Sequence, residues 1–269
     1  MTAMTDPRAL AAHRSRADPA GMFLHRHVAD EIEDRLSLVN KTFTAPAIVT
    51  GFPQEWRDFR PDTRIVPEAE VLALSPDSHD LIIHALSLHW ASDPVGQLIQ
   101  CRRALRPDGL LIVACFGGET LHELRRCLGQ AEIALKAGLS PRVAPMAELR
   151  DLGALMQRAG LALPVADLVP LNASYRDIWH LMTDLRRMGE TNALAGRLRS
   201  FTPRGLFDAA GELYRTHFAT EDKRIAATFE LVFLTGWAPA DSQPRPLRPG
   251  SAKARLADAL RTSETPLPD

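Results

Sequence analysis

One stretch in the first half of the chain constrains the fold most, because it combines two strand patterns with a helix pattern between them. Residues 80–88 (DLIIHALSL) are almost continuously apolar, and residues 109–116 (GLLIVACF) repeat that pattern. Between them Asp93-Pro94 offers a helix N-cap followed by the residue that suits the first helical position. The helix is predicted to end near 105, before the turn at 106–109 (RPDG). Two buried strands flanking a helix indicate a parallel β-α-β unit.

Apolar periodicity extends this alternation to the rest of the chain. The resulting prediction is an α/β protein with a mostly parallel sheet and helices on both faces. Ligands of such sheets bind beyond the carboxyl ends of the strands, so the loops after Gly51, Leu88 and Phe116 are the ones to inspect. Thr120 and Glu123 form a capping-box pattern. The remaining predicted helices are 23–39, 120–135, 146–159, 175–188 and 203–217, and the remaining predicted strands are 45–51, 64–66 and 225–237.

These elements divide the chain into three parts. Residues 1–22 are expected to be a flexible N-terminal leader. Residues 23–240 are expected to form the α/β domain, with a helical elaboration at about 140–220. Residues 241–269 form a Pro-rich tail.

Composition excludes several classes of function. A net charge of −1 and an aromatic fraction of 6% do not favour nucleic-acid binding. Three cysteines without a Cys-x-x-Cys pair suggest a reducing compartment and no metal site, and His25 and His27 do not share a helical face. With no apolar run long enough to span a membrane and no secretory h-region, the predicted location is cytoplasmic. No Ser-His-Asp set, P-loop or Gly-x-Gly-x-x-Gly motif is present.

Several short motifs resemble one family. They are SLHW (87–90), LRPDG (105–109), FGGETL (116–121), DLG (151–153), MGETN (188–192), SQPRP (242–246) and GSA (250–252). With them, from about residue 23 to 252, the chain resembles class I S-adenosylmethionine-dependent methyltransferases of the type 11 family. The downstream motifs resemble one branch of it, which contains the methyltransferase-like assembly factor of mitochondrial complex I, an arginine hydroxylase.

The resemblance implies a Rossmann-like methyltransferase fold and S-adenosyl-L-methionine as the cofactor. Family members carry an acidic residue and three closely spaced glycines after the first strand, where the backbone approaches the cofactor. This chain has VTGFPQE at 49–55 and keeps only Gly51. Asp80 follows Gly51 by 29 positions, which is short for the two strand–helix units usual there. The fold is therefore expected to lack one unit, with 64–66 aligned to the family's third strand.

Five residues are predicted to line the cofactor site: Gly51, Glu68, Ser87, His89 and Trp90. By the resemblance, Glu68 would accept from the adenine amine and Trp90 would cover the cofactor. His89 could act as a base, since its unperturbed pKa lies near neutrality. The alternatives are structural. Gly51 could be an ordinary strand-end glycine, Glu68 could lie at a helix start, and His89 and Trp90 could simply be packed.

Five more residues are predicted to meet a substrate or partner: Gly117, Gly118, Arg187, Glu190 and Asn192. The two glycines could admit a substrate close to the backbone, or could make only the sharp strand-to-helix turn. The other three belong to a patch that resembles a branch motif, and the alternative is a solvated helix end.

Three hypotheses for function follow. The first is a methyltransferase of unknown substrate, with a protein as one candidate. Methyl transfer depends on proximity and alignment, so it needs no fixed catalytic residue. The second is an assembly or maturation factor with a degenerate cofactor site, acting on a partner protein such as a complex I subunit, with or without hydroxylase activity. The third is an interaction module whose cleft is filled by side chains such as Phe52 and Trp56.

Overall fold

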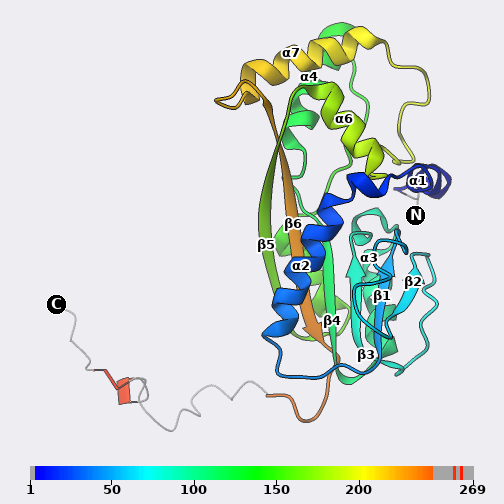
Figure 1. The fold of residues 1–269 in the computed structure, drawn as a ribbon, viewed down its shortest axis with the longest axis vertical. Helices are drawn as coiled ribbons and strands as arrows, with labels where there is room; N and C mark the ends of the chain where they lie inside the picture. Colours follow the sequence, from blue (N-terminus) through cyan, green and yellow to red (C-terminus); the bar gives the residue numbers. More distant parts are fainter. Residues whose placement is uncertain (1–3, 245–256, 259–260, 263–269) are drawn as a thin grey trace. The chain divides into compact units, whose positions relative to one another are not determined.

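The computed structural model describes residues 4–244, 257–258 and 261–262 (Figure 1). Its internal contacts divide the chain into Met1–Pro239 and Ala240–Asp269, and the fold below is that of the first unit. The end of the SQPRP motif and the whole GSA motif lie outside the described residues.

The centre of the first unit is a six-stranded sheet in the order β2-β1-β3-β4-β6-β5. The first four strands run parallel, and β6 is antiparallel to both of its neighbours, which confirms the mostly parallel α/β fold. The strands are β1 (Pro46–Thr50), β2 (Arg64–Pro67), β3 (His79–Ala85), β4 (Leu105–Phe116), β5 (Ala162–Tyr175) and β6 (Ile225–Trp237).

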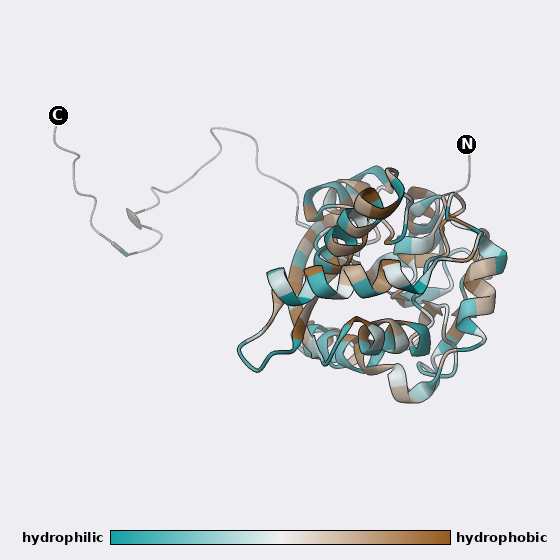
Figure 2. Cartoon of the chain, turned by 90° about the horizontal axis from the view of Figure 1, so that it is seen from above, coloured by the Kyte–Doolittle hydropathy of each residue, from teal (hydrophilic) through white to brown (hydrophobic). Residues whose placement is uncertain are grey.

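Helices cover both faces of this sheet. On one face apolar side chains of α2, α4, α6 and α7 form a core with the sheet, while α3 and α5 form a second core on the other. Brown and teal segments alternate along the helices in Figure 2, as expected for helices with one buried side. The helices are α2 (Phe23–Ser37), α3 (Pro94–Ala104), α4 (His122–Lys136), α5 (Leu149–Arg158), α6 (Ile178–Arg187) and α7 (Arg204–Phe218).

The predicted β-α-β unit is present as β3, α3 and β4. Asp93 caps α3, because its carboxylate accepts from the Gly96 N–H at 2.9 Å. Every residue of β3 is buried, which explains its unbroken apolar run. After β3 the chain makes a single 3-10 turn, η2 (Leu88–Trp90), which places the SLHW motif at the carboxyl edge of the sheet.

The stretch between β1 and β3 is shorter than in the family pattern. Residues 51–78 contain one strand and no helix, so the expected loss of one strand–helix unit is confirmed. We expected residues 64–66 in the position of the third strand. They instead pair directly with β1, Ile48 opposite Ile65 and Val49 opposite Val66, which is the position of the second strand in a doubly wound sheet.

One strand was not predicted, and one local prediction was wrong. The strand β5 was missed because it is an edge strand whose side chains are mostly exposed or half-buried, so it lacks a strong apolar pattern. The predicted capping box does not form, because Leu121, with φ 54°, is the N-cap of α4 and makes no side-chain cap. Glu123 instead accepts from the backbone N–H of Thr228 at 3.2 Å and from its hydroxyl at 2.6 Å.

The residues expected to be a flexible leader form structure where they are described. A helix, α1 (Pro7–Arg14), and a 3-10 turn, η1 (Pro19–Gly21), precede α2. Both begin with an Asp-Pro pair, in which the Asp6 or Asp18 carboxylate caps the helical N–H groups. Figure 1 shows α1 beside the end of α6, and this position brings α1 to the candidate site.

Candidate functional site

The candidate site begins at the carboxyl ends of β1 and β2. The hydroxyl of Thr50, the last residue of β1, accepts from the Phe52 N–H at 3.1 Å. The Thr50 carbonyl accepts from the Glu68 N–H at 3.0 Å. Because the two strands are neighbours, Gly51 and Glu68 lie side by side, as the sequence predicted for two residues of one site. Glu68 does not begin a helix.

Arg14 from the end of α1 occupies the space in front of Gly51. A Cβ added at Gly51 would overlap the Arg14 guanidinium, so the absence of a side chain at Gly51 lets the guanidinium approach the backbone this closely. The guanidinium forms an ion pair with Glu68 and lies 5.2 Å from the centroid of the Phe52 ring, within cation–π range. The side chain of Arg14 is only 8% exposed, and burial lowers its pKa.

A second group of polar side chains lies beside Arg14. Glu190, which follows α6, accepts from the Trp90 indole Nε1–H at 2.7 Å, and its Oε2 lies 3.4 Å from His89 Nε2. Burial alone would raise the pKa of Glu190, but His89, Arg14 and Trp90 outweigh it and hold this pKa below its usual value. The structure therefore brings the SLHW and MGETN motifs together through a buried carboxylate.

The side chains of Phe52, Trp56 and His25 pack together next to Arg14. The Trp56 indole Nε1–H donates to His25 Nδ1 at 3.0 Å, and the His25 ring packs against the Phe52 ring with centroids 4.8 Å apart. Burial lowers the pKa of His25 to about 4, so this histidine is neutral at physiological pH. Phe52 and Trp56 are both buried, as the interaction-module hypothesis expects.

Several polar atoms of these side chains have no hydrogen-bond partner within the described part of the chain. Among the described residues, Arg14 Nε and Nη2, His89 Nδ1 and Glu190 Oε1 are buried and have no hydrogen-bond partner. Buried polar groups are normally paired, so this cluster is polar, enclosed and incompletely satisfied. Such an arrangement is typical of a binding site rather than of a packed core.

Ser87 lies close by but turns toward the interior. Its hydroxyl lies 3.3 Å from His84 Nδ1, and His84 Nε2 lies 3.2 Å from the Gln97 side-chain oxygen. Burial lowers the pKa of His84 to about 4. Ser87 therefore supports the turn after β3, and His84 is a hydrogen-bonded core residue, as the sequence indicated.

The five residues predicted to meet a substrate or partner do not form one cluster. A Cβ at Gly117 would overlap the Glu230 carboxylate, and one at Gly118 would lie 3.0 Å from the Glu148 carboxyl carbon. These glycines therefore accommodate carboxylates of the chain itself.

Arg187 and Asn192 lie on either side of Glu190 and do not join it in the buried cluster. The Arg187 side chain is more than half exposed, with its Nε 3.9 Å from Asp18. The Asn192 amide donates to the Pro141 carbonyl at 2.8 Å.

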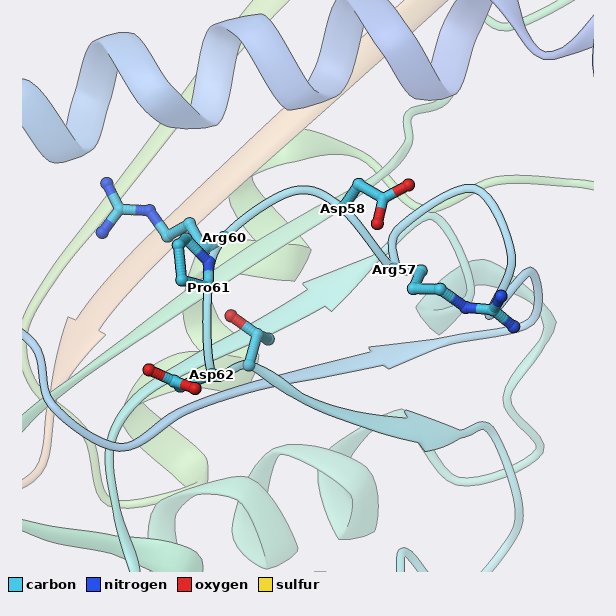
Figure 3. A pocket seen from close by; sticks show the side chains of 6 residues that line it. Arg57, Asp58, Arg60, Pro61 and Asp62 are labelled. Carbon is cyan, nitrogen blue, oxygen red and sulfur yellow. The ribbon is translucent and has the colours of Figure 1, made fainter.

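Other parts of the described chain show fewer features of a binding or catalytic site. No group of three or more His, Cys, Asp or Glu side chains could hold a metal ion there. A hollow of about 320 Å³ is lined by residues 57, 58 and 60–63. Figure 3 shows Arg57 and Arg60 pointing away from each other in it, and Arg60 is paired with Glu33 at 2.8 Å. No described helix is long and apolar enough to cross a membrane.

Comparison with known proteins supports a methyltransferase fold. The model of the methyltransferase domain family matches residues 36–113. A solved structure described as a methyltransferase, from Bacillus halodurans C-125, superposes with a TM-score of 0.50 at 11% identity, covering 79% of this chain and 99% of that one. The YcgJ protein of Bacillus subtilis gives a TM-score of 0.50 at 12% identity, covering 80% and 99%. The chain is therefore a methyltransferase-fold protein.

Curated proteins of similar sequence show which proteins the chain resembles. The mitochondrial arginine-hydroxylase NDUFAF5 of Dictyostelium discoideum is 38% identical over 197 residues, which are 73% of this chain and 45% of that protein. The human NDUFAF5 is 36% identical, covering 74% and 57%. The malonyl-[acyl-carrier protein] O-methyltransferase of Xylella fastidiosa is 33% identical, covering 69% and 60%. The chain thus spans about half the length of these relatives, and the resemblance inferred from the motifs is confirmed.

The fold implies S-adenosyl-L-methionine, so its fit can be tested against the residues at the site. In the family the cofactor approaches the backbone just after the first strand. Here the Arg14 guanidinium lies against Gly51, and Phe52 and Trp56 are buried beside it. With α1 in this position, the residues present do not fit the cofactor.

Arg14, His25 and the supporting role of Phe52 at the site were not predicted from the sequence. A signal for α1 was present, since Asp6-Pro7 is an N-cap followed by a suitable first helical residue. No signal in the sequence pairs Arg14 with Gly51, because that contact is between distant parts of the chain.

Proposed function

We propose that this chain is a maturation factor for a partner protein, built on a methyltransferase fold, and that it binds an arginine side chain of that partner. The observation that carries the proposal is the guanidinium already held at the site, between the Glu68 carboxylate and the Phe52 ring. A carboxylate and an aromatic face are the groups that recognise guanidinium best. The printed name of the NDUFAF5 relatives, arginine-hydroxylase, supports the same ligand class.

The site can be tested by emptying it. Arg14→Ala removes the internal guanidinium, and the variant should bind N-acetyl-arginine amide saturably in a calorimetric titration. N-acetyl-lysine amide should bind at least about tenfold more weakly, because an ammonium cannot reproduce the planar fork of donors. The double variant with Glu68→Gln should lose the binding. A folded Arg14→Ala protein that takes up no arginine probe would overturn the proposal.

Methyl transfer is the second candidate function. It is favoured by the family match over residues 36–113 and by the position of Glu68 beside Gly51, where an acid could accept from a nucleoside. The measurement is an equilibrium titration of the whole protein, and of Arg14→Ala, with S-adenosyl-L-methionine. If neither folded protein binds the cofactor at millimolar concentration, methyl transfer is excluded.

The location remains part of the proposal. The described cysteines are unpaired and buried, which suits a reducing compartment such as the cytoplasm, whereas the NDUFAF5 relatives are named as mitochondrial.

A further inference from the structure

The N-terminal segment, residues 4–22, is attached across the candidate site by a small set of contacts. The Thr5 hydroxyl donates to the Trp90 carbonyl at 2.9 Å. The Asp6 N–H donates to the Ala193 carbonyl and the Asp18 N–H to the Arg187 carbonyl, each at 2.7 Å. The segment is therefore tied at both ends of α1 to the chain on either side of Glu190.

These ties are weak for a structural element. Leu10 is the only buried side chain of α1. The Asp6 carboxylate pairs with Arg197 at 2.9 Å and Arg199 at 3.3 Å, and the side chain of Arg199 is 72% exposed. The pair with Arg199 is exposed and contributes little to stability, so the half-buried pair with Arg197 is the main polar tie of Asp6. Little apolar burial therefore holds α1 in place.

The contact at the end of α1 is costly to maintain. Arg14 is a buried cation with two nitrogen atoms, Nε and Nη2, that have no hydrogen-bond partner in the described residues. A buried charge that is only partly satisfied loses hydration without full compensation. The helix α1 buries one apolar side chain and ends at an incompletely paired charge, so it is suited to leave its position, while Met22, buried at the start of α2, anchors the end of the segment.

We propose that residues 4–22 form an autoinhibitory plug, in which Arg14 takes the place of the partner's arginine until the partner displaces it. The inference rests on the proposed function, because it assumes that the place between Glu68 and Phe52 accepts an external guanidinium. It adds a regulation of that site. The resting protein is closed by its own arginine, and a ligand binds only as α1 withdraws.

The test compares the whole wild-type protein with two variants of the same helix. Arg14→Ala removes the plug's guanidinium, and Arg8→Ala, at an exposed position of α1, is the matched control. With N-acetyl-arginine amide as the probe, Arg14→Ala should bind at least about tenfold more tightly than wild type, since competition by the internal arginine is removed. Arg8→Ala should behave as wild type.

Hydrogen exchange supplies a second measurement that does not depend on the Arg14 variant. High concentrations of the probe should accelerate amide exchange of residues 7–14 in the wild type, and Glu68→Gln should accelerate it without any probe, whereas Glu70→Gln should not. Equal probe affinity of wild type and Arg14→Ala, with unchanged exchange in α1, would overturn the plug and leave the proposed function standing. Failure of folded Arg14→Ala to bind the probe would overturn the proposed function itself. Should Arg14→Ala not fold, Arg14→Gln takes its place in the same comparison.

Discussion

Three ionisable side chains from distant parts of the chain form one largely buried cluster. Arg14 lies between Glu68, with which it pairs, and Glu190, whose pKa it helps to lower. Two carboxylates and one guanidinium carry a formal net charge of −1, and the Trp90 indole N–H and the His89 ring beside Glu190 stabilise the excess negative charge. Removing one member of such a set leaves the others buried and uncompensated.

Glu68→Gln should therefore destabilise the protein by about 2 kcal/mol, because the buried Arg14 guanidinium loses its charged partner. The measurement is the free energy of unfolding from urea denaturation. Glu70→Gln is the matched control, since its side chain is exposed two residues further on, and it should change stability by less than about 0.5 kcal/mol. A Glu68→Gln protein as stable as that control would show that the ion pair contributes nothing.

Buried histidines should make the stability pH-dependent. Burial lowers the pKa of both His25 and His84 to about 4, whereas unfolded histidine titrates near 6.5. Between these values the unfolded state binds more protons, so stability falls as pH is lowered from about 6.5 toward 4. At pH 5 each histidine should account for about 2 kcal/mol of the loss.

Urea denaturation at pH 7.5 and pH 5.0 measures this loss. The variant His84→Gln should lose less stability than the wild type over the same interval, because one of the two protonation sites is absent. An identical loss in both proteins would assign the pH dependence to other groups.

At the scale of single helices and strands, apolar periodicity predicted the elements that bury one side. The strand β6 has the predicted bounds, 225–237, and α2 begins at the predicted residue, Phe23. The edge strand β5 escaped prediction because one sheet edge is unpaired and its side chains alternate between half-buried and exposed. The capping box failed because Glu123 finds two donors on Thr228 of β6, a tertiary contact that local spacing cannot reveal.

Two helices end on glycines that can be compared directly. Gly160 after α5 and Gly189 after α6 have φ of 78° and 74°, and each donates to a carbonyl three residues back. A Cβ at Gly160 would meet only Arg102, at 3.5 Å, whereas a Cβ at Gly189 would lie 3.0 Å from Phe52 Cζ. Both positions have the same left-handed backbone conformation, and they differ in how closely neighbouring side chains approach an added Cβ.

Gly160→Ala should therefore cost about 1 kcal/mol, the penalty for a left-handed alanine. Gly189→Ala should cost more by about 1 kcal/mol or more, because the added methyl group overpacks against the Phe52 ring at the site. Unfolding free energies of the two variants measure the difference. Equal costs would mean that the segment carrying Glu190 is not pressed against Phe52.

For the molecule as a whole, the sequence predicted the fold better than the site. Continuous apolar strands and the Asp93-Pro94 helix start are local signals, and they were enough for a mostly parallel sheet. The loss of one unit followed from the short spacing between Gly51 and Asp80 compared with the family that the chain resembles. The meeting of His89, Trp90 and Glu190 did not follow from the sequence, which predicted the first two for a cofactor site and Glu190 for a substrate or partner patch. The occupation of the site by Arg14 did not follow either, because a single charged residue near the N-terminus carries no mark of its tertiary partner.

The three cysteines provide a measure of how cooperatively this molecule opens. Cys101 and Cys115 lie in the core under α3 and α5, and Cys127 lies in the core on the opposite face. Burial raises the pKa of Cys101 and Cys115 to about 12 and that of Cys127 to about 11, so all three thiols should resist a thiol reagent in the native state. If both faces unfold together, the three should react at one common rate in urea, as peptide mapping would show. Separate rates would mean that one face opens independently.

The covalent attachment of Arg14 to the chain has a consequence for selectivity. An occupant joined to its own site by a short connection behaves as if present at millimolar concentration, whatever the concentration of the protein. Free arginine would have to exceed that level to compete. A protein that presents an arginine together with additional contacting surface gains affinity from both. The tethered side chain would thus set a concentration threshold that small guanidines cross only above the millimolar range, whereas a large complementary partner crosses it at lower concentration.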